Sequence, residues 1–293
     1  MQSLRLNSND SPALSARFYD GGEGIKGAVV IGGAMGVRQD YYAPFAQWLT
    51  TQGFSVMTFD YRGMGESRAP AQARSLRGFD ADLFAWARDY DTAIDALRAR
   101  APNAPLYLIG HSLGAQLPGL LRNRAHIEGL LSIAAGSGYW RDNAPQLKRM
   151  VLYFWYVLVP VATALCGYFP GRRIGKVGDL PRGVVLQWRR WCLNPRYAVG
   201  AEGALVREQF GQVRFPVVAL SITDDELMTE RGTRVLIDCY ANAPRRIERV
   251  APADVSAKRI GHFGFFRDQF QSSLWARSVA LLQGFMALKE TTA

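Results

Sequence analysis

The sequence is poor in cysteine, and its few cysteines form no recognisable pattern. Cys166, Cys192 and Cys239 are odd in number and widely spaced, and no C-x-x-C pair occurs. Such a set favours a reducing compartment and provides neither a disulfide framework nor a zinc motif. Residues 1–11 also lack the order of basic and then apolar residues that is typical of a signal peptide. We therefore expect a cytoplasmic protein.

Lysine and histidine are scarce as well. Only five of the 35 basic residues are lysine, so the net charge of +10 at pH 7 comes almost entirely from arginine. The arginines are scattered and form no basic run with interleaved aromatic residues, which argues against a nucleic-acid partner. The three histidines do not cluster with cysteines at the spacing of metal ligands, so we expect no metal and no other cofactor.

The chain does contain a regular alternation of predicted strands and helices. Its 293 residues, 48% of them hydrophobic, are enough for one large α/β domain with an insertion. Alternation of this kind implies a mostly parallel sheet with helices on both faces. Apolar runs predict strands at residues 14–19, 27–31, 54–61, 105–109, 127–135, 216–222 and 245–250. Helical spacing of apolar residues predicts helices at residues 40–52, 80–100, 113–125, 229–240 and 270–288.

The alternation stops at residues 136–210, where aromatic, glycine- and proline-rich sequence replaces it. We therefore divide the chain into a core of residues 1–135 and 211–293 and an insertion between them. Residues 150–169 carry no charge and are numerous enough to span a bilayer. A span would place the two halves of the sheet on opposite sides of the membrane, and Pro160 divides the run. We expect a buried or pocket-lining helix pair, then contact with a membrane surface, and least of all a true span.

One serine lies between a predicted strand and a predicted helix. Residues 110–114 read Gly-His-Ser-Leu-Gly and follow an apolar run. Glycines two residues before and two residues after Ser112 remove the side chains that would collide as the helix folds back over the strand. The pattern predicts a nucleophile elbow, in which a strained Ser112 carries its hydroxyl above the sheet.

A serine hydroxyl is a weak nucleophile until a base takes its proton, and the usual base is a histidine oriented by a carboxylate. His262 lies in a glycine-flanked loop after the last predicted strand, where that base is required. His111 belongs to the elbow and favours a structural role, and His126 precedes a strand at a solvated position. The acid is expected after the preceding strand, where Asp225 is favoured and Asp224 stays open as the alternative.

Acyl transfer also requires hydrogen-bond donors for the oxyanion. The backbone N–H of Leu113, the residue after the nucleophile, opens a helix and points at the site. A second donor is expected from the glycine-rich turn at residues 32–36, with Ala34 as the first choice and Met35 as the second. The predicted site is thus complete in its residue types.

Taken together, these motifs resemble the α/β-hydrolase family. Residues 60–67, Asp-Tyr-Arg-Gly-Met-Gly-Glu-Ser, match a further family motif, D-x-R-G-x-G-x-S, which shapes the floor near the site. The chain is also similar to a bacterial subgroup of predicted serine hydrolases, through Gly-Tyr-Phe-Pro-Gly at residues 167–171 and Gly-His-Phe-Gly-Phe-Phe-Arg at residues 261–267. Gly-Gly replaces the usual His-Gly at residues 32–33, and Pro118 interrupts the helix behind the nucleophile, but neither departure removes a catalytic group.

The resemblance implies an α/β-hydrolase fold in which residues 136–210 form a lid. It also implies a serine esterase or thioesterase that acts on a small-molecule ester through an acyl-enzyme, with lipid contact through the lid left open. There are two alternatives. One is an acyltransferase or amidase with the same triad, and the other is a ligand-binding or partner-binding protein on this scaffold. An apolar lid suits a hydrophobic substrate group. Its candidate contacts are Trp140, Tyr153, Trp155, Tyr156 and Trp188.

Overall fold

A computed structural model describes residues 1–8, 11–175 and 177–290 of the chain. Its centre is an eight-stranded sheet in the order β1-β2-β4-β3-β5-β6-β7-β8. The strands from β3 to β8 run parallel, whereas β2 is antiparallel to both β1 and β4. The predicted fold class, a mostly parallel sheet within an α/β-hydrolase fold, is confirmed.

The central strands are fully buried because helices cover both faces of the sheet. The sequence prediction omits β1, an edge strand in which Leu6 is the one buried side chain among residues 2–7. The strands are β1 (Gln2–Ser8), β2 (Ser11–Tyr19), β3 (Gly27–Gly32), β4 (Phe54–Phe59), β5 (Leu106–His111), β6 (Ile127–Ile133), β7 (Val217–Ile222) and β8 (Arg245–Val250).

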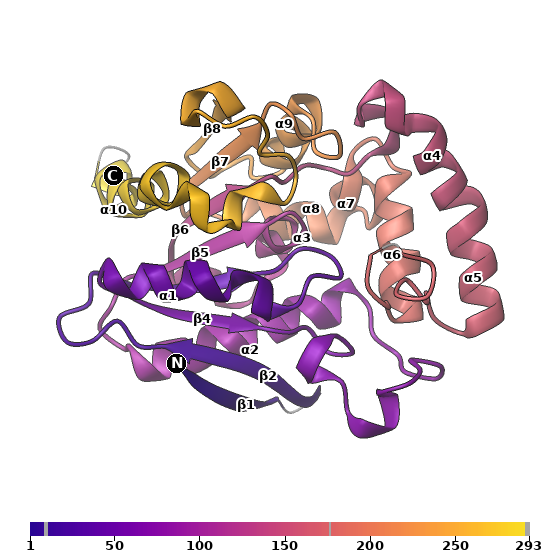
Figure 1. Ribbon diagram of the computed structural model, residues 1–293, viewed down its shortest axis with the longest axis horizontal. Helices are drawn as coiled ribbons and strands as arrows, with labels where there is room; N and C mark the ends of the chain where they lie inside the picture. Colours follow the sequence, from indigo (N-terminus) through magenta and orange to yellow (C-terminus); the bar gives the residue numbers. More distant parts are fainter. Residues whose placement is uncertain (9–10, 176, 291–293) are drawn as a thin grey trace.

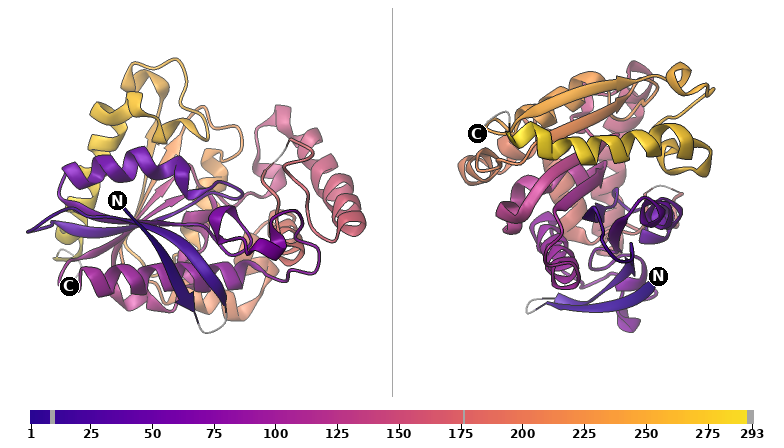
Figure 2. Two further views of the ribbon diagram at one scale, coloured as in Figure 1. Left: turned by 60° about the horizontal axis from the view of Figure 1, so that its bottom comes forward. Right: turned by 90° about the vertical axis from the view of Figure 1, so that its left-hand side faces the viewer.

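Helices α1 (Ala43–Thr51) and α10 (Ala276–Glu290) cover one face of the sheet, with a π-helical turn at Gln271–Trp275 before α10 (Figure 2). Helices α2 (Leu83–Arg100), α3 (Leu113–Gln116) and α9 (Glu230–Asp238) cover the other. The prediction of a helix over residues 113–125 is wrong, because α3 ends before Pro118. Proline has no N–H to continue the helical hydrogen bonds, and 3₁₀ turns follow at Pro118–Leu120 and Asn123–His126.

The chain between β6 and β7 is largely helical, and we call it the lid. It contains α4 (Lys148–Tyr153), α5 (Val159–Cys166), α6 (Arg182–Cys192), α7 (Tyr197–Ala201) and α8 (Ala204–Gly211). Helices α4, α5 and α6 lie at the outer end of the molecule, whereas α8 lies further in, near α3 (Figure 1).

Helices α4 and α5 form one continuous helix, here named the outer lid helix, through a π-helical turn at Phe154–Leu158. The predicted division of this run at Pro160 is therefore wrong. The π turn directly precedes Pro160, and Pro160 lies in the first turn of α5, where a missing N–H is tolerated, so the helix continues. By length and composition, the helix over Pro145–Cys166, with a mean hydropathy of 1.6, is the one helix among the described residues that could cross a membrane. Only 22% of its most apolar window is buried.

Candidate active site

The turn after β5 holds Ser112 in a left-handed backbone conformation with φ of 51°. Residues other than glycine adopt this conformation only where the surroundings enforce it. A Cβ atom at Gly114 would lie 2.0 Å from the carbonyl oxygen of Gly32, and one at Gly110 would lie 2.5 Å from the backbone nitrogen of Ala115. Both glycines are therefore required for α3 to fold back over the sheet. The strained turn predicted from the sequence is confirmed.

The loops after β7 and β8 bring Asp225 and His262 together. Nδ1 of His262 lies 2.7 Å from Oδ2 of Asp225, and both residues are buried. Oδ1 of Asp225 accepts hydrogen bonds from the N–H groups of Leu227 at 2.9 Å and Met228 at 3.0 Å. Both carboxylate oxygens are thus held in place. A proton on Nδ1 leaves Nε2 of the neutral imidazole as the acceptor nitrogen.

Asp224, the alternative acid, has a different role, so that alternative is wrong. Its carboxylate accepts hydrogen bonds from the N–H groups of Ile260 and Gly261, both at 3.0 Å. These two residues directly precede His262. The neighbouring carboxylates therefore share one task, since Asp225 orients the imidazole while Asp224 fixes the loop that carries it.

The glycine-rich turn after β3 contributes a different donor from the one the sequence favours. Ala34 lines the cavity beside Ser112, but its N–H already donates to Oη of Tyr42 at 2.8 Å. Ala34 as the oxyanion donor is therefore wrong. Within the described part of the chain, the N–H groups of Met35 and Leu113 have no acceptor. Met35, the second choice, also lines the cavity.

His111 connects this turn to the loop of His262. The carbonyl oxygen of His262 can only accept, so the neutral ring of His111 carries its proton on Nε2, and Nδ1 accepts from Oη of Tyr42 at 2.9 Å. Nε2 of His111 then donates to the carbonyl oxygen of His262 at 2.9 Å. Burial lowers the pKa of His111 to about 3, which keeps the imidazole neutral in this arrangement. The sequence predicts a structural role for His111 but not this connection.

A cavity of about 400 Å³ has Ser112 and His262 in its wall. Tyr153, Trp155 and Trp188, three of the predicted substrate contacts, line it as well. The rest of the wall is largely apolar. The sequence analysis does not assign its further lining residues to the site; they are Gly138, Asn143, Met150, Val151, Phe154, Leu158, Val177, Cys192, Leu227, Met228 and Phe263. The spacing of 150, 154 and 158 is that of one helix face, a signal present in the sequence.

Trp140 and Tyr156 are wrong as predicted substrate contacts. Trp140 lies outside the cavity and packs edge-to-face against Tyr139, with ring centroids 6.3 Å apart. Tyr156 lies on the outward side of the outer lid helix, where it is 56% exposed and contacts the guanidinium of Arg189. Both errors arise because aromatic content alone does not say which side of a helix faces the cavity.

Comparisons with known proteins agree with this fold. Residues 23–178, more than half of the chain, match the model of the family described as serine aminopeptidase, S33. Over 75 residues the chain is 32% identical to lysophosphatidylserine lipase ABHD12 of Gallus gallus and of Mus musculus. That match covers 26% of this chain but only 17% and 16%, respectively, of the two lipases.

Solved structures resemble the whole chain. A soluble variant of monoglyceride lipase from Saccharomyces cerevisiae, in complex with a substrate analog, gives a TM-score of 0.68 at 14% identity over 96% of this chain and 94% of that chain. A carboxyl esterase from Bacillus coagulans, in complex with glycerol, gives 0.68 at 14% identity over 97% and 98%. At this identity the likeness establishes the fold. With the family match and the serine turn, it follows that the chain belongs to the serine aminopeptidase S33 family of the α/β-hydrolase superfamily.

Proposed function

We propose that this α/β-hydrolase of the esterase and lipase type cleaves a carboxylic ester or thioester whose acyl or alcohol group is hydrophobic. One observation carries the proposal. The buried pair of Asp225 and His262 lies at the same cavity as Ser112, and most of the remaining wall is apolar. A polar reaction centre in an apolar cavity suits a substrate that combines a reactive carbonyl with a hydrophobic chain.

In the proposed reaction, Oγ of Ser112 attacks the carbonyl carbon while Nε2 of His262 takes the hydroxyl proton. The same nitrogen then gives this proton to the leaving alcohol or thiol, which yields the acyl-enzyme. Water enters, loses a proton to His262 and releases the acid, and Ser112 regains its proton. Asp225 stabilises the imidazolium that forms in each half. The N–H groups of Met35 and Leu113 would bind the oxyanion, and each such donor contributes about 3 kcal/mol to transition-state stabilisation.

The lining of the cavity favours an ester over the N-terminal amide that an aminopeptidase cleaves. An aminopeptidase binds the α-ammonium group of its substrate beside the scissile bond. Burying an ammonium group is costly unless a carboxylate or comparable acceptor compensates it. Among the described residues that line this cavity there is no aspartate or glutamate. We therefore place the substrate outside the class that gives the family its name.

We also propose that the outer lid helix contacts a lipid surface. Five of its six exposed large apolar residues, all except Tyr156, recur at three- and four-residue spacing and so share one side of the helix. Met150 and Tyr153 belong both to this side and to the cavity lining, which gives an apolar chain continuous contact from the surface to the site. The side consists of Met150, Tyr153, Val157, Val161 and Leu165. A helix that lies on the membrane surface in this way does not carry the core into the bilayer. The cytoplasmic location stays a prediction.

Hydrolysis of p-nitrophenyl esters with acyl chains of increasing length tests the function. We expect turnover that is abolished in Ser112→Ala and retained in Ser132→Ala, a buried serine whose hydroxyl has no partner among the described residues. A fluorophosphonate probe should label the wild type and not Ser112→Ala. Absence of both turnover and labelling would refute the proposal. Adding a competing alcohol or amine separates hydrolysis from acyl transfer, because a transferase yields the new ester or amide instead of the free acid.

A further inference from the structure

A second cavity, of about 370 Å³, lies directly beside the catalytic one. Met35 and Val177 line the catalytic cavity, and their neighbours Gly36 and Gly178 line the second. The two segments touch through their backbones, since a Cβ atom at Gly36 would lie 2.6 Å from the backbone nitrogen of Gly178. A group bound in the second cavity would therefore contact both the turn that carries Met35 and the lid segment opposite it.

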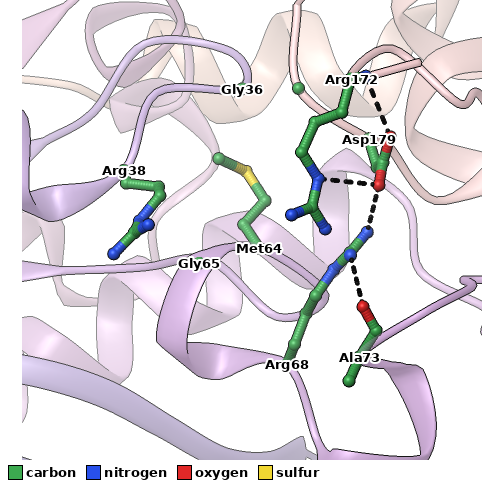
Figure 3. A pocket seen from close by; sticks show the side chains of 9 residues that line it. Gly36, Arg38, Met64, Gly65, Arg68, Ala73, Arg172 and Asp179 are labelled. Carbon is green, nitrogen blue, oxygen red and sulfur yellow. Dashed lines mark hydrogen bonds and ion pairs between the residues drawn. The ribbon is translucent and has the colours of Figure 1, made fainter.

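The side chains of this cavity are dominated by arginine (Figure 3). Arg68 and Arg172 lie on one side and share the single lining carboxylate, that of Asp179. Asp179 accepts from Nη2 of Arg68 at 3.1 Å, from Nε of Arg172 at 3.0 Å and from the backbone N–H of Arg172 at 3.0 Å. Arg68 is only 8% exposed, and its pKa is lowered by burial and then by the charge of Arg172. One carboxylate thus faces two guanidinium groups.

A third guanidinium, that of Arg38, lies on the opposite side of the cavity, with the side chain of Met64 between the two sides (Figure 3). Arg38 pairs with Asp40, which lies outside the lining and is shared with Arg17. The guanidinium of Arg38 turns away from Arg172 toward that carboxylate, so the positive charge that faces the cavity is that of Arg68 from the core and Arg172 from the lid. These two guanidinium groups face the single carboxylate of Asp179, an imbalance that an anion would relieve.

We propose that this cavity, the arginine pocket, binds a phosphate or carboxylate group at Arg68 and Arg172. The forked guanidinium group matches both anions through paired N–H donors. The backbone at Gly36 and Gly65 presents no side chain there, which leaves room for the oxygens. The bound anion would bridge the core and the lid next to the oxyanion turn. It is either the charged head group of the ester substrate, a use that rests on the proposed function, or a free phosphate-type anion.

Titration calorimetry of the full chain with inorganic phosphate tests the site independently of hydrolysis. We expect saturable binding that is weakened at least about tenfold in Arg68→Gln and in Arg172→Gln, because each removes a charge-assisted hydrogen-bond donor. Arg173→Gln is the matched control, since Arg173 is the exposed neighbour of Arg172 and lies outside the lining. Absence of saturable binding, or equal weakening in Arg173→Gln, would overturn the proposal.

Two esters with the same short acyl chain separate the sources of the anion. One is a monoacylglycerol, and the other is the corresponding acylglycerol 3-phosphate. If the head group is the ligand, kcat/KM for the phosphate ester relative to the neutral ester falls about tenfold in Arg172→Gln and is unchanged in Arg173→Gln. If a free anion is the ligand, the ratio is unchanged, and added phosphate alters the rate on the neutral ester in the wild type only. If phosphate binds but neither of these two responses is observed, a link between the arginine pocket and the candidate active site is contradicted. Failure to hydrolyse either ester refutes the proposed function and leaves the calorimetric result standing.

Discussion

The loops around Ser112 and the outer lid helix are held in different ways. A continuous chain of buried hydrogen bonds runs from Ala34 through Tyr42 and His111 to the carbonyl oxygen of His262. The outer lid helix instead meets the rest of the protein through apolar packing. The side-chain hydrogen bonds recorded to its backbone come from Arg189, to the carbonyl oxygen of Trp155, and from Arg77, to that of Leu165.

This difference suits the proposed role of each region. Proton transfer requires groups placed to within a fraction of an ångström, and networks of buried polar groups provide that placement. Accommodating a hydrophobic chain requires surface rather than fixed geometry. Helix α6 of the lid is intermediate in the number of its hydrogen bonds to the core. The N–H of Leu83 in the core donates to Oε1 of Gln187 on α6 at 2.6 Å. Buried side-chain hydrogen bonds thus become fewer outward from the candidate site.

The largest effect is expected where the two carboxylates are exchanged for amides. Asp225→Asn should lower kcat on a soluble ester by roughly 10⁴-fold, because the amide favours the wrong tautomer of His262. Asp224→Asn should lower kcat less than about tenfold, since an amide oxygen still accepts one of the two N–H groups that hold the loop. Comparable losses in both variants would contradict the separate roles. Circular dichroism of each variant checks that the fold is retained.

Acid should weaken the buried network through His111. Its pKa is near 6.5 in the unfolded chain and about 3 in the folded protein, so below pH 6.5 the unfolded state binds the extra proton. The contribution of this histidine to stability is complete above pH 6.5 and is lost as the pH falls toward 3, by up to about 1.4 kcal/mol per pH unit. Urea unfolding at several pH values should show that the free energy of unfolding falls less steeply with decreasing pH in His111→Gln than in the wild type. In the control variant His126→Gln, which alters an exposed histidine, the free energy of unfolding should depend on pH as it does in the wild type.

Removing the hydroxyl of Tyr42 should loosen the same network at neutral pH. Tyr42→Phe leaves the N–H of Ala34 and Nδ1 of His111 without their partner, which should lower the free energy of unfolding by about 2 kcal/mol. Tyr61→Phe is the control, because the buried hydroxyl of Tyr61 has no partner among the described residues and should change stability by less than about 0.5 kcal/mol. Urea unfolding measures both. Equal values would show that the network contributes little.

The smallest effect is expected on the outer lid helix, and only at a lipid surface. Leu165→Asp should reduce binding to phospholipid vesicles by about tenfold or more, because burial of an exposed leucine contributes about 1.5–3 kcal/mol. Hydrolysis of a short soluble ester should not change. Leu205→Asp, which alters an exposed leucine on α8, should leave vesicle binding unaffected. A loss of binding in both variants, or in neither, would contradict a specific lipid-contacting side.

The sequence alone predicts those features that local sterics and chain order determine. Gly110 and Gly114 can be recognised because a tight strand-to-helix turn leaves no room for a side chain at either position. His262 can be recognised because few histidines are present and only one follows the last strand. The alternation of strands and helices predicts the parallel sheet in the same way. Each of these depends on neighbours in sequence or on the order of elements.

Only the tertiary structure decides between residues that are chemically equivalent. Asp224 and Asp225 differ by one position, and packing of the loop after β8 against them determines which carboxylate meets the imidazole. Ala34 and Met35 differ because the N–H of Ala34 donates to the hydroxyl of Tyr42, a residue that lies just before α1. The arginines of the second cavity come from the core and the lid and meet only when the chain folds. Such choices depend on distances between remote segments, which no local pattern encodes, whereas the serine turn is complete within five residues.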